Sequence, residues 1–138
     1  IYSWHHRGTQ QRPGLVLGLD RGGSCLGRAY RIAPENAEAV IAYLDEREMV
    51  TAVYRPVRHV VRLPGSIVAA RAYVVDRGHP QYAGKLSLED QARLIDGARG
   101  ISGVNIDYLA STVAHLDEMG ISDGPLHRVW RLLGAPSA

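Results

Sequence analysis

The sequence predicts an α+β fold, in which strands and helices occupy separate stretches of the chain instead of alternating. Two early segments have the composition of hairpins, one helical segment lies between them, and the chain beyond residue 86 has helical periodicity. A hydrophobic share of 46% is ordinary for a packed globular protein. The 138 residues suit one domain spanning 1–138.

The first predicted hairpin lies near the start of the chain. Arg12-Pro13-Gly14 indicates a turn, which is followed by an apolar strand, Leu15–Leu19. Asp20-Arg21-Gly22-Gly23 has the composition of a hairpin turn, so Ser24–Ile32 is predicted to be the return strand.

The second predicted hairpin is longer. It consists of Thr51–Leu63, the turn Pro64-Gly65, and Ser66–Val75. Pro56 indicates an edge strand or a bulge, because proline has no N–H to donate to a neighbouring strand. Two hairpins around one helix are compatible with a small mixed barrel, although periodicity alone does not decide whether it closes.

Three helices are predicted after the hairpins. Ser87 with Asp90 has the pattern of a capping box ahead of a helix that includes Leu88 and Ile95. Helical spacing then covers Asn105–Met119, and a last short helix is expected from about Pro125 to Leu133.

The composition excludes several classes of function. The net charge is only +2 and the arginines are scattered, so we expect no nucleic-acid partner. No apolar run approaches the ~20 residues of a membrane span, and a single cysteine, Cys25, excludes an internal disulfide and Cys-rich zinc sites. The dispersed histidines predict no metal. A cytoplasmic protein is the expectation, and the oligomeric state stays open.

Glu48 is the residue that periodicity singles out for chemistry. Pro34 favours a helix start, and the apolar stripe that follows is Ala37, Ile41 and Leu44. Glu48 comes four residues later on the same face, where a carboxylate costs free energy unless it is used. A Glu in such a place suits proton transfer. The alternative is that the helix ends before Glu48 and leaves its side chain solvated.

Five segments of the chain recur together, in this order, in one known family. They are Arg7-Gly8 through Pro13-Gly14, Gly27-Arg28-Ala29-Tyr30-Arg31, Tyr43-Leu44-Asp45-Glu46-Arg47-Glu48, His79-Pro80-Gln81-Tyr82-Ala83-Gly84, and Gly103-Val104-Asn105-Ile106-Asp107-Tyr108-Leu109. With these segments the chain resembles the ChaC family of glutathione-specific γ-glutamylcyclotransferases over most of its length.

The resemblance implies a γ-glutamylcyclotransferase-like mixed β-barrel with flanking helices. It implies an enzyme that cleaves glutathione, a small-molecule substrate, into 5-oxoproline and Cys-Gly without a cofactor. Glu48, the last residue of the Y-L-x-x-R-E segment, would be the general acid/base, and Tyr54, Tyr108 and Asn105 would bind substrate. Alternatively, the tyrosines pack in the core and Asn105 caps its helix.

The chain departs from the family pattern at its start. The family begins with a strand and a Y-G-S-L loop that holds the γ-glutamyl group, and no such loop occurs in this sequence. Family spacing implies that it lies upstream of Ser3, and we expect it in the parent protein because the Glu48 region is intact. The alternative is a truncated and inactive copy. Two other readings stay open: a cyclotransferase for other γ-glutamyl amines, and a small-ligand-binding or regulatory barrel without catalysis.

Overall fold

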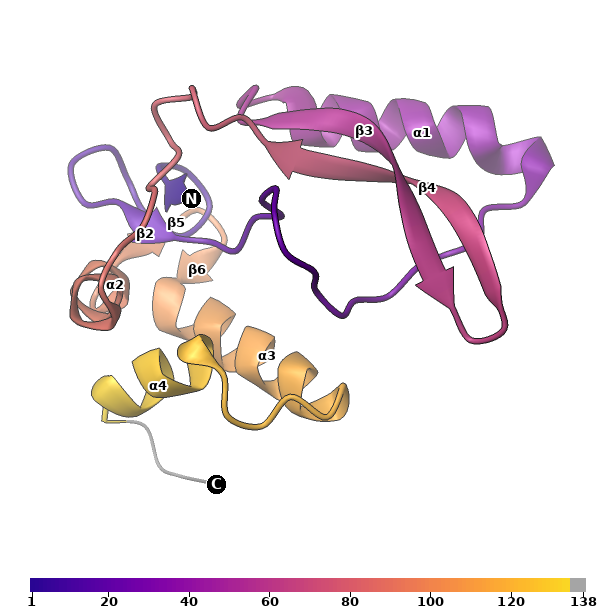
Figure 1. Cartoon of the computed structure of the whole chain (residues 1–138). Helices are drawn as coiled ribbons and strands as arrows, with labels where there is room; N and C mark the ends of the chain where they lie inside the picture. The colour runs from indigo at the N-terminus through magenta and orange to yellow at the C-terminus, as the bar shows by residue number, and fades with distance from the viewer. Residues whose placement is uncertain (135–138) are drawn as a thin grey trace. The chain divides into compact units, whose positions relative to one another are not determined.

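The computed structural model describes residues 1–134, which form two compact units (Figure 1). The first unit comprises Ile1–Leu17 together with the residues from Ala83 on, and the second unit comprises Gly18–Tyr82. Each unit has its own set of strands and helices. The expectation of a single domain over residues 1–138 stays a prediction.

The second unit is built on a long hairpin, as predicted. β3 (Tyr54–Leu63) and β4 (Ser66–Val75) pair antiparallel over their whole length around the turn at Pro64-Gly65. Pro56 lies opposite Tyr73 without an extra residue in the register, so the bulge alternative is wrong. Within residues 1–134, β3 pairs only with β4, which confirms an edge strand at Pro56.

The helix α1 (Pro34–Met49) runs along this hairpin (Figure 1) and contacts β3. Proline occupies its first turn, where the missing N–H leaves no helical hydrogen bond unmade. The half-buried positions of α1 include the predicted stripe, Ala37, Ile41, Leu44 and Glu48. No residue of α1 is fully buried, so the helix packs against the hairpin through side chains that stay partly exposed to solvent.

The predicted first hairpin is wrong. Residues 21–31 are all exposed and contain no strand, and Leu19 forms only an isolated bridge to Val74 of β4. The carboxylate of Asp20 accepts hydrogen bonds from Arg77 Nε at 2.8 Å and from the Tyr82 hydroxyl at 2.9 Å. These bonds, that from Arg77 above all, lower the pKa of Asp20 to about 2. They hold Asp20 beside the segment after β4, so it does not close a hairpin turn.

The first unit contains two short sheets and three helices. The strands are β1 (Tyr2–Ser3) with β2 (Gly14–Leu15), and β5 (Arg99–Gly100) with β6 (Gly103–Val104), each pair antiparallel. The helices are α2 (Leu88–Ile95), α3 (Asn105–Glu118) and α4 (Pro125–Leu132), which confirms the three predicted helices, and the ends of the last two to within a residue. The Ser87 hydroxyl accepts the N–H of Asp90 at 3.1 Å, which confirms the Ser87 half of the predicted capping box.

The apolar faces of these three helices meet in one core. Its buried members are Ala92 and Ile95 of α2, Leu109 and Val113 of α3, and Val129 of α4. Each of these helices thus buries apolar surface against the others, which is the main source of stability of the unit. Through Leu109 and Val113, α3 takes part in this core and packs against α4.

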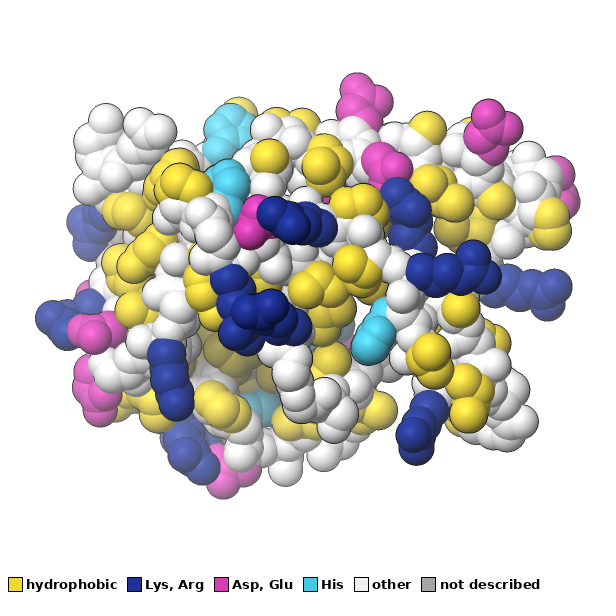
Figure 2. Space-filling view, turned by 45° about the horizontal axis from the view of Figure 1, so that its top comes forward, with side chains coloured by type: hydrophobic (Ala, Val, Ile, Leu, Met, Phe, Trp, Pro, Cys, Tyr) yellow, Lys and Arg dark blue, Asp and Glu magenta, His cyan; other side chains and the backbone are white. Residues whose placement is uncertain are grey.

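The order of elements confirms the α+β class, while each sheet within residues 1–134 has two strands. Two strands cannot bury both faces of a sheet. Val60 and Ile67 of the hairpin are accordingly 61% and 67% exposed, and hydrophobic side chains reach the surface among the Lys and Arg side chains (Figure 2). None of the helices within residues 1–134 has both the length and the apolar composition that a bilayer crossing requires.

Candidate functional site

Glu48 lies in the last turn of α1. The helix continues to Met49, so the alternative in which it ends before Glu48 is wrong. The side chain is half-buried on the stripe that faces the hairpin. Within residues 1–134 its carboxylate has no hydrogen bond or ion pair with another side chain. Both oxygens are therefore free to accept a proton or a hydrogen bond from a ligand.

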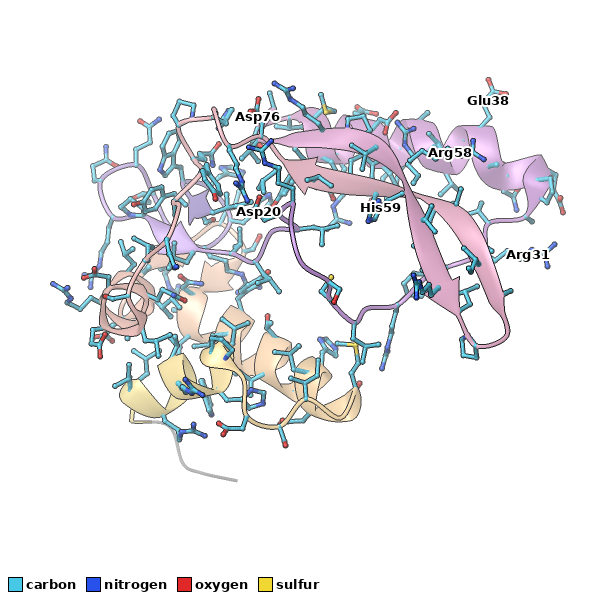
Figure 3. All side chains as sticks on the ribbon, in the orientation of Figure 1. Asp20, Arg31, Glu38, Arg58, His59 and Asp76 are labelled. Carbon is cyan, nitrogen blue, oxygen red and sulfur yellow. The ribbon has the colours of Figure 1, made fainter. Side chains whose placement is uncertain are left out.

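Tyr54 lies on the face of the hairpin that α1 covers. Side chains alternate between the faces of a strand, so Tyr54 and Arg58 share a face of β3. Arg58 is paired in register with Arg71 of β4, and the Arg71 guanidinium reaches Asp45 of α1. Figure 3 shows Arg58 on the α1 side of the hairpin. The structure thus brings Glu48 and Tyr54 to the same layer between helix and hairpin.

An ionic cluster that the sequence analysis missed lies in this layer. Asp45 accepts hydrogen bonds from Arg71 Nη2 at 2.7 and 2.8 Å, one to each carboxylate oxygen, and from the Tyr73 hydroxyl at 2.5 Å. The bonds from Arg71 chiefly, and then that from Tyr73, lower the pKa of Asp45. Burial, followed by the bond to Asp45, raises the pKa of Tyr73. At neutral pH the carboxylate is ionised and the phenol is protonated, so both bonds persist.

The sequence carried a faint signal for this cluster. Asp45 follows Ile41 by four residues and precedes Glu48 by three, so it shares the inward stripe. Arg71 likewise interrupts the otherwise apolar second half of the hairpin. A charge of each sign in two segments that pack together indicates an ion pair, and the hairpin register then decides which residues meet.

Asn105 holds a strand of the first unit. It is the first residue of α3, whose N-cap is Val104, so the interpretation of Asn105 as the cap is wrong. Its Oδ1 accepts the N–H of Leu15 at 2.7 Å, and its Nδ2 donates to the carbonyl of Leu15 at 2.8 Å. The side chain is fully buried. It pairs with Leu15 as a neighbouring strand would, on the edge of β2 that β1 leaves open.

Gly14 makes this approach possible. A Cβ atom at residue 14 would lie 2.6 Å from Oδ1 of Asn105 and 2.4 Å from the carbonyl oxygen of Arg7. Gly8, from the same R-G-x-x-x-x-P-G segment, is equally confined, because its Cβ would lie 2.1 Å from the backbone nitrogen of Gly14. The two glycines therefore allow the loop between β1 and β2 to fold closely against α3.

Tyr108 lies one turn after Asn105 and contacts the same segment. Its hydroxyl accepts the N–H of Leu17 at 3.0 Å, and the guanidinium of Arg7 lies 5.7 Å from the centre of its ring. Arg7 also donates to the carbonyl of Val104 at 3.2 Å. Asn105 and Tyr108, both predicted site residues, thus bind the same segment of the first unit, while Glu48 and Tyr54 lie in the second unit.

Replacing Tyr108 with Phe removes the acceptor of the Leu17 N–H and keeps the ring. We expect the free energy of unfolding to fall by about 0.5–1 kcal/mol, as for one partly solvated hydrogen bond. Urea denaturation measures this change. Tyr30→Phe is the matched control, because Tyr30 is 83% exposed and its variant should unfold like wild type. Equal stability of the two variants would contradict the role of the Tyr108 hydroxyl.

A hollow of about 340 Å³ lies beside α2, lined by Tyr2, Leu86, Asp90, Arg93 and Leu94. None of the predicted site residues borders it. Within residues 1–134, no three His, Cys, Asp or Glu side chains are arranged to hold a metal ion.

A family model, described as ChaC-like protein, matches residues 1–133. The glutathione-specific γ-glutamylcyclotransferase of Escherichia coli K12 is 36% identical over 137 residues, which cover 92% of this chain and 59% of that protein. The mouse glutathione-specific γ-glutamylcyclotransferase 1 is 35% identical over 75% of this chain and 49% of its own length. The matched region thus spans 59% of one of these curated relatives and 49% of the other.

The fold also has a solved counterpart. A crystal structure of a γ-glutamyl cyclotransferase specific to glutathione, from yeast, matches with a TM-score of 0.74 at 19% identity. The match covers 96% of this chain and 82% of the yeast chain. At this identity the likeness concerns the fold alone.

Proposed function

Because the chain belongs to the ChaC-like protein family, we propose that its full-length protein is a glutathione-specific γ-glutamylcyclotransferase. The E. coli and mouse relatives are named as specific for glutathione, which supports glutathione as the substrate. The observation that carries the proposal for this chain is Glu48. A half-buried carboxylate without a partner within residues 1–134 stands at the end of the Y-L-x-x-R-E segment, on the face of α1 toward the hairpin.

The proposed reaction is an internal aminolysis. The α-amine of the γ-glutamyl unit attacks the γ-amide carbonyl, a C–N bond closes a five-membered lactam, and the C–N bond to Cys-Gly breaks. The attacking ammonium nitrogen loses two protons as it becomes the N–H of the lactam, and the departing nitrogen gains two as it leaves as the ammonium group of Cys-Gly, so neither water nor an oxidant is consumed. Because both reactants belong to one molecule, correct folding of the substrate supplies up to about 7–11 kcal/mol of the barrier reduction.

Glu48 serves both proton steps in this proposal. It accepts one proton from the attacking nitrogen and delivers one to the nitrogen of Cys-Gly, and each nitrogen exchanges its second proton with solvent. Proton transfer by a positioned side chain contributes about 10²–10⁴-fold to a rate. The half-burial of Glu48 supports the role, because limited access of water strengthens its interaction with a bound ammonium. These steps use no metal and no organic cofactor.

Substrate binding is proposed for the remaining predicted residues. Tyr54 shares the layer of Glu48 and presents a half-buried ring and a hydroxyl for the γ-glutamyl chain. Tyr108 is proposed to contact substrate through its half-buried ring, since its hydroxyl binds Leu17. Both polar atoms of the Asn105 amide bind Leu15, so the contribution proposed for Asn105 is to hold that backbone in place beside the substrate. The oxyanion donors are assigned to the family's Y-G-S-L loop.

The barrel and the cellular location belong to the same proposal. We propose that the full-length protein is one domain with a mixed β-barrel and flanking helices. The outer edge of β3, which has no strand partner besides β4 within residues 1–134, supports it, since a further strand would cover this edge. A cytoplasmic location is supported by Cys25, a free and exposed thiol that suits a reducing compartment.

Incubating the full-length protein with glutathione tests the proposal. We expect 5-oxoproline and Cys-Gly in equal amounts. A panel of other γ-glutamyl amines, assayed in parallel, should react much more slowly. Fast turnover of the panel without glutathione turnover would indicate a cyclotransferase for another amine. Absence of any turnover would leave a binding or regulatory protein and contradict the proposal.

A further inference from the structure

The end of α1 that carries Glu48 is weakly held by apolar packing. No residue of the helix is fully buried, and Val50, which follows it, is 80% exposed. Leu44 is half-buried, as are the other apolar residues of the stripe. When a buried helix shifts, it leaves cavities in the core, and these cost much free energy. A helix that packs through a half-exposed face leaves no such cavity, so it can shift along the hairpin more easily.

The hydrogen bonds of Asp45 fix α1 to the hairpin more firmly than the half-buried apolar stripe does. The Arg71 guanidinium holds both of its carboxylate oxygens, at 2.7 and 2.8 Å, and the Tyr73 hydroxyl holds one of them at 2.5 Å. A planar guanidinium restrains a carboxylate in direction as well as in distance. Arg71 and Tyr73 both belong to β4, a strand paired along its whole length, so these bonds tie α1 to the rigid part of the unit.

Asp45 is also placed to pass this restraint on to Glu48. Residues three apart on a helix are neighbours on one face, with Cβ atoms about 5–6 Å apart. Fixing Asp45 therefore sets the height of Glu48 above the hairpin and its rotation about the helix axis. Position 45 is one of the two that the Y-L-x-x-R-E pattern leaves open, so the pattern does not specify this anchor, which consists of Asp45, Arg71 and Tyr73.

We propose that Asp45, held by Arg71 and Tyr73, is a positioning residue that sets the place of the Glu48 carboxylate relative to the substrate. This inference rests on the proposed function, because it concerns the rate at which Glu48 transfers protons. Asp45 itself does not touch the substrate. Its carboxylate oxygens are already occupied, and its negative charge is balanced by Arg71.

The expected effect lies in kcat. Displacing a reacting group by about 1 Å can cost about 10²-fold in rate, so Asp45→Asn should lower kcat for glutathione by about 10–100-fold. The KM for glutathione should stay within about two-fold, because the variant removes no contact with the substrate. Thermal stability should change little, since the side chains of Asp45 and Arg71 are 35% and 38% exposed.

Asp123→Asn is the matched control. Asp123 forms an exposed pair with Arg131, with 2.9 Å between Oδ1 and Nη2, and both residues lie in the first unit, away from α1 in sequence. The same chemical change there removes an ion pair without touching the anchor, so kcat should equal that of wild type. A matching loss of kcat in Asp123→Asn would overturn the inference.

Repeating the substitution in the Glu48→Gln variant distinguishes a positioning role of Asp45 from a general loss of structure. In Glu48→Gln the group to be positioned is absent, so adding Asp45→Asn should not lower the residual rate further. Tyr73→Phe, which loses one hydroxyl from the anchor, should lower kcat in the same direction as Asp45→Asn. It replaces Asp45→Asn in every comparison should that variant not fold.

Three results contradict the inference: an unchanged kcat in Asp45→Asn, a rise in KM that accounts for the whole loss, or an equal loss in the Glu48→Gln background. Failure of the proposed function looks different, because wild type itself would then make no 5-oxoproline. An active wild-type enzyme with an active Asp45→Asn variant keeps the proposed function and removes only the anchor.

Discussion

Glu48→Gln in the full-length protein is expected to lower kcat for glutathione by about 10²–10⁴-fold with little change in KM. Gln has nearly the same shape as Glu and still forms hydrogen bonds, but its amide cannot take the ammonium proton. Binding should therefore survive while proton transfer fails. Steady-state assays of 5-oxoproline over a range of glutathione concentrations separate the two constants.

Glu46→Gln is the control for this result. Glu46 lies on the same helix two residues earlier, is exposed, and undergoes the same chemical change. Its kcat and KM should match those of wild type. Should Glu48→Gln retain wild-type activity, or should both variants lose activity alike, Glu48 is not the proton carrier.

Asn105→Ala is expected to destabilise the protein by about 2–3 kcal/mol, because it leaves both the N–H and the carbonyl of Leu15 without their partner. The side chain is fully buried, so water cannot replace it without opening the packing between α3 and β2. Urea unfolding gives the change as a shift of the midpoint at constant slope.

Asn36→Ala provides the comparison for Asn105→Ala. Asn36 lies in the first turn of α1 and is exposed, so the same truncation should change the free energy of unfolding by a few tenths of a kcal/mol at most. Similar stability of the two variants would show that the bonds between Asn105 and Leu15 contribute nothing.

Elements with local causes could be predicted from the sequence. Pro34 and the apolar spacing after it are enough to specify α1, and the turn at Pro64-Gly65 is enough to specify the hairpin. The prediction of a strand over Ser24–Ile32 was wrong because it depended on the local turn composition at Asp20. The hydrogen-bond partners of Asp20 lie far away in the sequence. Arg77 and Tyr82 are 57 and 62 residues away in the chain.

The same distinction holds for the site residues. The helical period places Glu48 on the inward face without any knowledge of the hairpin, and the structure has it there. Asn105 looked like a cap because helix starts favour Asn, yet its partner is Leu15, 90 residues earlier. The anchor at Asp45 depends on the register of β4, which decides that Arg71 and Tyr73 meet α1. No pattern in the sequence specifies such pairings.

The fate of the substrate nitrogen tests the central claim most directly. Glutathione labelled with ¹⁵N at its α-amine is incubated with the full-length protein in H₂¹⁸O. Internal cyclisation that depends on Glu48 predicts 5-oxoproline that retains ¹⁵N and contains no ¹⁸O, formed at a rate that collapses in Glu48→Gln. Glutamate carrying ¹⁸O as the first product, or 5-oxoproline formed as fast by Glu48→Gln as by wild type, would contradict the account.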